Sequence, residues 1–166
     1  MVSLTTPICD FGCSAKDFQL PGVDNKHWNI ESIKGANGLV VMFICNHCPY
    51  VKAIMSRLVR DANELKNFGI NTIAISSNDV VNYPEDSFEN MKLLAEENHF
   101  EFPYTFDETQ EIAKAYDAIC TPDFFGFNSK LELQYRGRFD STGRGEVQTN
   151  NKRELFEAMK LVAETQ

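Results

Sequence analysis

Basic residues are scarce in this chain: 16 lysines and arginines stand against 24 aspartates and glutamates, a formal net charge of −8. A nucleic-acid-binding domain normally carries a basic surface, so we expect no nucleic-acid partner. Long apolar runs are also missing, so we expect no membrane partner. The first residues, Met1 to Pro7, lack the basic start and apolar stretch of a secretory signal. We therefore expect a cytoplasmic protein.

The cysteines follow neither the pattern of a disulfide-stapled secreted domain nor that of a structural zinc site. Their number, five, is odd, and they fall as Cys9 and Cys13, Cys45 and Cys48, and Cys120. A structural zinc site usually takes four ligands, often from two C-x-x-C pairs, and only one such pair is present. One redox-active pair in a reducing compartment fits this distribution. We interpret the first two cysteines as ordinary thiols; a second disulfide or half of a metal site are the alternatives.

The apolar residues that are present suffice for one buried core. The length of 166 residues, 43% of them hydrophobic, predicts a single domain over residues 1–166. The wholly apolar run from Leu39 to Ile44 is typical of a strand buried on both faces. An amphipathic helix follows it, and the β-rich stretch Ile70 to Ser76 predicts a second, parallel strand. This strand-helix-strand unit indicates an α/β fold.

The other segments surround that unit. A capping box is predicted at Asp107 to Gln110, where it opens a short helix. We expect a central mixed β-sheet flanked by helices, because the last two strands are joined by a short turn and must run antiparallel. The pattern predicts an N-terminal hairpin, a helix-and-strand insert, a second hairpin and a final helix, at residues 17–30, 84–106, 123–139 and 152–164.

Cys45 and Cys48 stand where the central strand passes into the helix. A helix start offers unpaired N–H groups and partial positive charge, which stabilise a reactive thiolate. Three positions apart, the two thiols can form a small disulfide loop. We favour a redox pair over half of a zinc site or two inert core cysteines. Cys45, placed at the exposed tip of the helix, is then the nucleophile, and Cys48 resolves the mixed disulfide.

His47 lies between the two cysteines. A protonated or hydrogen-bonding imidazole stabilises the Cys45 thiolate and so the reduced protein, which makes the pair more oxidising. We therefore count His47 with the catalytic residues; a merely exposed histidine is the alternative. We expect no cofactor and no metal ion. The expected partners are protein or small-molecule disulfides and thiols, with an external thiol as the reductant.

A strand that ends in Cys45-Asn46-His47-Cys48-Pro49 and a later Thr121-Pro122 that opens a hairpin resemble the thioredoxin superfamily. The early Asp17-Phe18-Gln19-Leu20-Pro21 and the insert between Asn78 and Phe106 are similar to its redoxin branch. That branch holds the alkyl hydroperoxide reductase/thiol-specific antioxidant domains and the TlpA-like thiol-disulfide proteins. The resemblance implies a thioredoxin-like fold. It also implies a cis Thr121–Pro122 peptide facing the dithiol, where the Thr121 backbone pairs with a bound substrate chain.

The sequence departs from these relatives in three ways. Peroxiredoxins place a threonine three residues before the peroxidatic cysteine, and Met42 stands there if that cysteine is Cys45. Thioredoxins carry a buried acid in the central strand, and Leu39 to Ile44 contains none. Cys120 lies beside the proline loop. We interpret Cys120 as a packed small residue; a third redox partner and a metal ligand are the alternatives.

Two rival functions stay open. The first is a thiol peroxidase, an antioxidant enzyme of the redoxin family. The second is a copper- or zinc-binding module that uses Cys45 and Cys48 together with His47 or Cys120.

Overall fold

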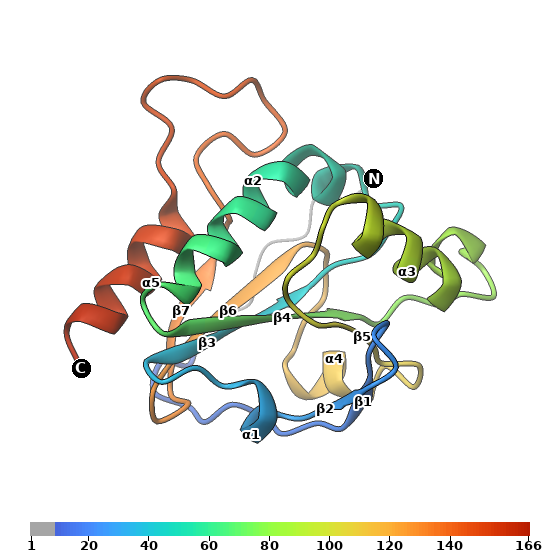
Figure 1. Cartoon of the computed structure of the whole chain (residues 1–166), viewed down its shortest axis with the longest axis horizontal. Helices are drawn as coiled ribbons and strands as arrows, with labels where there is room; N and C mark the ends of the chain where they lie inside the picture. The colour runs from blue at the N-terminus through green and yellow to red at the C-terminus, as the bar shows by residue number, and fades with distance from the viewer. Residues whose placement is uncertain (1–8) are drawn as a thin grey trace.

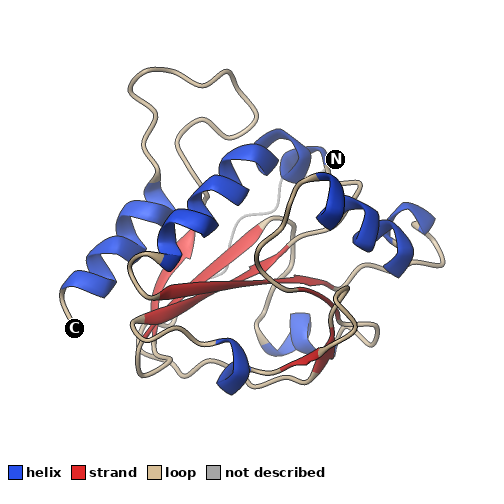
Figure 2. Cartoon of the chain, in the orientation of Figure 1, coloured by secondary structure: helices blue, strands red, loops and turns tan. Residues whose placement is uncertain are grey.

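The structure is a computed structural model and describes residues 9–166, so the expectation for Met1 to Pro7 lies outside the described residues. Five strands form one mixed sheet in the order β5-β4-β3-β6-β7 (Figures 1 and 2). The pairs β3·β4 and β4·β5 are parallel, and the pairs β3·β6 and β6·β7 are antiparallel. This confirms the predicted α/β class and mixed sheet. The strands are β3 (Gly38–Phe43), β4 (Ile70–Ser76), β5 (Tyr104–Phe106), β6 (Asp123–Asn128) and β7 (Leu133–Gly137).

Strand β3 is buried along its whole length. Its side chains alternate between the two faces of the sheet, as in any strand. Val40 and Met42 join the hydrophobic cluster that includes residues of α2, α3 and α5, while Leu39, Val41 and Phe43 join the cluster on the opposite face with α1 and the end of α4. Figure 1 shows this division of the helices. The helices are α1 (Ile30–Ile33), α2 (Pro49–Lys66), α3 (Phe88–Glu97), α4 (Glu111–Ala115) and α5 (Glu154–Glu164).

The predicted N-terminal hairpin is present but short: β1 (Leu20–Pro21) pairs antiparallel with β2 (His27–Trp28). The insert differs more from its prediction. Instead of one helix from Pro84, a 3₁₀ turn η1 (Pro84–Asp86) is followed by a break at Ser87. Ser87 has extended backbone angles and its side chain accepts a hydrogen bond from the first turn of α3, so it caps a new helix. Because the helix is interrupted at Ser87, Asp86 faces the loop that follows β3.

The capping box predicted at Asp107 to Gln110 is wrong. Gln110 has a left-handed backbone, with φ of 62°, and the helix starts only after it. Asp107 is buried and accepts hydrogen bonds from Ser77 Oγ at 2.7 Å and Ala113 N at 3.0 Å. It therefore ties the end of β4 to α4. None of the helices within residues 9–166 is long and apolar enough to cross a membrane.

A buried ion pair holds the start of β6. Arg136 Nη2 lies 2.9 Å from Asp123 Oδ2, and the two side chains are 5% and 2% exposed. The guanidinium also lies 4.4 Å from the ring centre of Phe125. Burial raises the pKa of Asp123, and Arg136 opposes that rise. Removing the arginine alone therefore leaves a buried carboxylate without its counter-charge.

Arg136→Met is expected to lower the free energy of unfolding by about 3–5 kcal/mol, because a broken buried ion pair leaves one charge uncompensated. Arg138→Met is the matched control, since Arg138 pairs with Glu154 at the surface and its side chain is 66% exposed. We expect little change there, because surface ion pairs contribute little. Urea unfolding followed by circular dichroism measures both. Similar losses in the two variants would contradict the assignment.

Candidate active site

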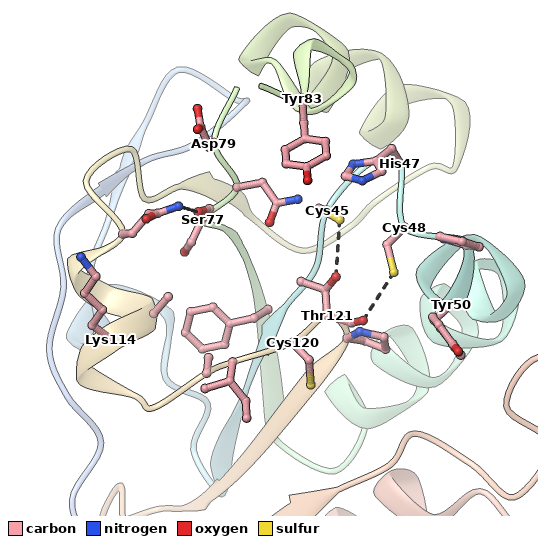
Figure 3. Close-up of a pocket in the computed structure, with 18 residues that line it drawn as sticks. Cys45, His47, Cys48, Tyr50, Ser77, Asp79, Tyr83, Lys114, Cys120 and Thr121 are labelled. Atoms are coloured by element: carbon pink, nitrogen blue, oxygen red, sulfur yellow. Dashed lines mark hydrogen bonds between the residues drawn. The ribbon is translucent and has the colours of Figure 1, made fainter. Parts of the chain in front are cut away.

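The two candidate redox cysteines lie in the loop that joins β3 to α2 (Figure 3). Cys45 comes two residues after β3, and Cys48 is the N-cap of α2, which begins at Pro49. The expectation that Cys45 occupies the helix tip is therefore wrong, because the helix starts four residues later. Both cysteines are free thiols, and 1% of Cys45 and 7% of Cys48 is exposed.

The Thr121–Pro122 peptide is cis, as the resemblance to thioredoxins implies. It precedes β6, whose first residue, Asp123, pairs with Phe43 at the end of β3. Thr121 contacts both sulfurs: Cys45 Sγ lies 3.5 Å from its Oγ1, and Cys48 Sγ lies 3.4 Å from its carbonyl oxygen. The structure thus brings together the two segments that the sequence analysis selected.

The two thiols share one proton. Their mutual hydrogen bond lowers the pKa of Cys48 to about 5 and raises the pKa of Cys45. Burial opposes the effect on Cys48 and adds to the effect on Cys45, where the negative charge of Asp86 contributes as well. The Cys48 thiol makes no capping hydrogen bond, but the N–H groups of Val51 and Tyr50 also favour its thiolate. The directions of the two pKa shifts place the thiolate on Cys48, whereas the 3.4 Å contact between Cys48 Sγ and the Thr121 carbonyl oxygen, which can only accept, suits a protonated Cys48.

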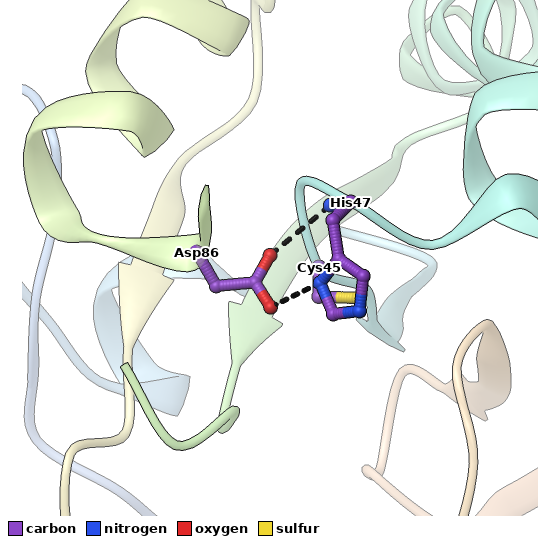
Figure 4. Close-up of side chains that lie close together, drawn as sticks. All are labelled: Cys45, His47 and Asp86. Atoms are coloured by element: carbon purple, nitrogen blue, oxygen red, sulfur yellow. Dashed lines mark hydrogen bonds and ion pairs between the residues drawn. The ribbon is translucent and has the colours of Figure 1, made fainter. Parts of the chain in front are cut away.

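The His47 ring lies beside Cys45 (Figure 4), and one-third of its side chain is exposed. Its Nδ1 lies 2.5 Å from Asp86 Oδ2, and its backbone N–H donates to Asp86 Oδ1 at 3.1 Å. Its ring stacks on Tyr83, with 5.0 Å between ring centres and 7° between planes. Asp86 is fully buried. A buried carboxylate and an aromatic ring, both from the insert, thus fix the histidine.

Asn46 joins the same loop to β5. Its side-chain Oδ1 accepts a hydrogen bond from the Tyr104 hydroxyl at 2.9 Å, and its Nδ2 donates to the Glu85 carbonyl at 3.0 Å. Burial raises the pKa of Tyr104 well above its ordinary value, so the hydroxyl remains a donor at neutral pH. Asn46 and His47, the two residues between the cysteines, are therefore held by hydrogen bonds to residues that lie beneath the dithiol.

A cavity of about 800 Å³ opens over the two sulfurs. Phe43, Ala118 and Ile119 give it an apolar side, and Gln110 and Lys114 add polar groups from α4 and the residue before it. Figure 3 shows both sulfurs directed toward Thr121 at one end of this space. The cavity is large enough for a small disulfide or for a short stretch of extended peptide.

Cys120 also lines this cavity and is half-buried. Its pKa is raised, first by burial and then by the charge of Asp123, so it is a protonated thiol at neutral pH. Cys9 and Cys13 are half-buried as well. Within the described part of the chain, neither of them lines the cavity. Three thiols thus line this cavity, the pair Cys45 and Cys48 and the neighbouring Cys120.

Cys45, His47 and Asp86 each offer a ligand atom, and these atoms lie within 4.8 Å of one another. The Asp86 oxygens, however, already accept hydrogen bonds from the Asn46 and His47 backbone, the His47 ring and the Asn78 side chain. The carboxylate is thus engaged by the protein's own donors. The arrangement favours a hydrogen-bonded relay over an ion-binding site.

Two residues of this site were not predicted from the sequence, Tyr83 and Asp86. Asp86 stands in a Pro-Glu-Asp stretch that reads as the acidic first turn of a helix. One signal was available, because parallel strands β3 and β4 end at the same edge of the sheet. Residues that follow β4 therefore lie near the cysteines, but no sequence pattern singled out Asp86.

Two solved structures resemble the chain at more than 30% identity. An uncharacterized conserved protein from Geobacillus kaustophilus is 42% identical with a TM-score of 0.93, and the match covers 99% of this chain and 87% of that chain. A hypothetical protein from Sinorhizobium meliloti 1021 is 33% identical with a TM-score of 0.89, over 95% of this chain and 86% of that one. A comparison with curated proteins gave no match.

A more distant structure identifies the fold. A thiol:disulfide interchange protein of the thioredoxin family, from Chlorobium tepidum TLS, is 15% identical with a TM-score of 0.70, over 94% of this chain and 99% of that one. This confirms the thioredoxin-like fold. Residues 11–147 match the AhpC/TSA family. The family and the fold together support thiol redox activity, and the redoxin resemblance is confirmed: the chain belongs to the AhpC/TSA family.

Proposed function

We propose that this protein is a thiol-disulfide oxidoreductase that cycles Cys45 and Cys48 between a dithiol and an intramolecular disulfide. The supporting observation is that both sulfurs contact Thr121 beneath an open cavity, and the lowered pKa of Cys48 agrees with it. Such a pair contains a standing thiolate, which can attack a disulfide, and a neighbouring thiol, which can resolve the product. Thr121 contacts both sulfurs and can hold a substrate beside them.

In this proposal Cys48 attacks and Cys45 resolves. The sequence analysis assigned the opposite order, on the argument that Cys45 begins the helix. The lowered pKa of Cys48, its N-cap position and its greater exposure support the new order. Cys45 is more deeply buried and retains its proton, which suits the second step of the exchange.

The Cys48 thiolate attacks one sulfur of a substrate R–S–S–R′ and expels R′–S⁻, which takes a proton from water. Cys45 then gives up its proton and attacks the Cys48 sulfur, so that the Cys45–Cys48 bond forms and R–S⁻ leaves to become R–SH. Two electrons pass to the substrate, and an external thiol restores the dithiol. The reverse sequence oxidises a substrate dithiol.

The substrates in this proposal are protein or small-molecule disulfides and thiols, because the cavity has room for either. A reducing compartment such as the cytoplasm suits a chain with five cysteines, an odd number, and one C-x-x-C pair. A thiol peroxidase is the second candidate. The lowered pKa of Cys48 favours it, since the thiolate is also the form that attacks a peroxide.

Mild oxidation with glutathione disulfide is expected to give one intramolecular disulfide, between Cys45 and Cys48, detected by peptide mass mapping. Replacing either cysteine by serine is expected to abolish turnover of a model disulfide. Cys120→Ser is the matched control, a thiol of the same cavity, and is expected to keep turnover. Cys45→Ser is expected to accumulate a mixed disulfide on Cys48, because the resolving thiol is gone.

Three results would go against this assignment. A mixed disulfide that accumulates on Cys45 in the Cys48→Ser variant, and not on Cys48 in the Cys45→Ser variant, would reverse the two roles. Failure to form the intramolecular disulfide at any glutathione ratio would remove the redox function. Rapid consumption of micromolar hydroperoxide through Cys48, without exchange on disulfides, would favour the peroxidase.

The pH dependence of alkylation tests the shared proton. With a pKa of about 5, Cys48 loses its proton as the pH rises through that value. Its labelling by iodoacetamide is therefore expected to be nearly constant above about pH 6 and to fall as the solution is acidified. Cys45→Ala removes the hydrogen-bond donor, so the fall is expected at higher pH, whereas Cys120→Ala is expected to leave the profile unchanged. A profile centred at the ordinary cysteine pKa in the wild type would rule the shared proton out.

A further inference from the structure

Asp86 is a fully buried carboxylate whose partners all belong to the site. Its Oδ1 accepts from the backbone N–H groups of Asn46 at 2.8 Å and His47 at 3.1 Å. Its Oδ2 accepts from Asn78 Nδ2 at 2.7 Å and lies 2.5 Å from His47 Nδ1. A buried charge is costly unless donors or an opposite charge compensate for it. Four contacts meet that need here, and two of them come from His47.

These contacts leave the histidine one free nitrogen. Nδ1 faces the carboxylate, so it carries the ring proton, as in any neutral imidazole that donates to an acid. Tyr83 stacks on one face of the ring, and the side chain is one-third exposed. Nε2 is therefore the nitrogen that can take up and release a proton. Cys45 Sγ lies within 4.8 Å of a ring nitrogen, and Figures 3 and 4 show the ring beside Cys45.

Cys45 must lose its proton before it can form the intramolecular disulfide. The central strand Gly38–Phe43 has no acidic residue to accept that proton. We propose that Asp86 is a positioning residue of the dithiol site, which holds His47 with Nδ1 protonated so that Nε2 takes the proton of Cys45. The inference rests on the proposed exchange at Cys45 and Cys48. Nothing in the sequence pattern or the family match assigns a role to Asp86.

The proton step closes the exchange. In the mixed disulfide, Cys48 is bonded to the sulfur of the substrate. The Cys45 thiol passes its proton to His47 Nε2 and attacks the Cys48 sulfur, which breaks the bond to the substrate. The departing thiolate R–S⁻ takes the proton from the imidazolium. Asp86 remains ionised and balances the positive charge while it exists, as an acid behind a catalytic histidine does.

Asp86→Asn is the test variant, and Glu85→Gln is its matched control. Glu85 is the neighbouring acid of η1, and its side chain is exposed. Ellman's reagent separates the two steps, because attack by Cys48 releases the first chromophore and resolution by Cys45 releases the second. We expect Asp86→Asn to slow the second release by on the order of 10-fold or more beyond any effect on the first, as loss of a general base does. Glu85→Gln is expected to change neither release by more than about two-fold.

The pH dependence of the rate of the second release is a further test, because the loss of a merely structural residue would not shift it. Asp86→Asn is expected to shift this profile, and Glu85→Gln is expected to keep the wild-type profile. Besides Asp86, the titratable groups that face this proton path are Cys48, Tyr83 on the ring face and Tyr104 behind Asn46. Equal rates and equal profiles for Asp86→Asn and the wild type would overturn the proposal.

The tautomer of His47 provides a second test that needs no variant. Nitrogen-15 shifts of the folded wild-type protein are expected to show a protonated Nδ1 and a free Nε2 in neutral His47. A protonated Nε2 would refute the inference even if Asp86→Asn fails to fold. Failure of the wild type to release the second chromophore at all is a distinct result, because it contradicts the dithiol exchange itself and not only the role of Asp86.

Discussion

The burial of β3 on both faces is the constraint on which the site depends. A strand with no exposed residue must be paired on both edges, and β4 and β6 supply those edges. Because β4 runs parallel to β3, the two end at the same side of the sheet. Because β6 runs antiparallel, it begins there. Strand pairing alone therefore brings three segments to one edge of the sheet: the dithiol loop, the insert and the cis Thr121–Pro122 peptide.

The groups around the dithiol shift the pKa values of its two thiols in opposite directions. The helix start and the Cys45 thiol favour the thiolate on Cys48, while the buried Asp86 disfavours one on Cys45. The same carboxylate orients His47 toward Cys45. Asp86 thus helps to keep Cys45 protonated in the reduced protein. It also positions His47, the group that can remove that proton. The two thiols are chemically equivalent in the sequence and are distinguished only by this environment.

The sequence predicted the framework because the framework follows from local patterns. The apolar run from Leu39 to Ile44 predicted the central strand to within a residue, and the amphipathic pattern that follows predicted α2 but not its start. The cysteine pair and Thr121–Pro122 were found from motifs. The start of α2 could not be fixed, because Asn46 and His47 are tied by tertiary hydrogen bonds to Glu85 and Asp86. Those hydrogen bonds join residues about 40 positions apart. No local sequence pattern indicates them.

The reduction potential of the Cys45–Cys48 pair tests the central claim most directly. It is measured by equilibration with reduced and oxidised glutathione, acid quenching, alkylation and mass analysis. A standing thiolate stabilises the reduced protein, so the account predicts a potential nearer to the about −180 mV of protein disulfide isomerase than to the about −270 mV of thioredoxin. A value at or below that of thioredoxin would contradict the claim that the site holds Cys48 as a thiolate.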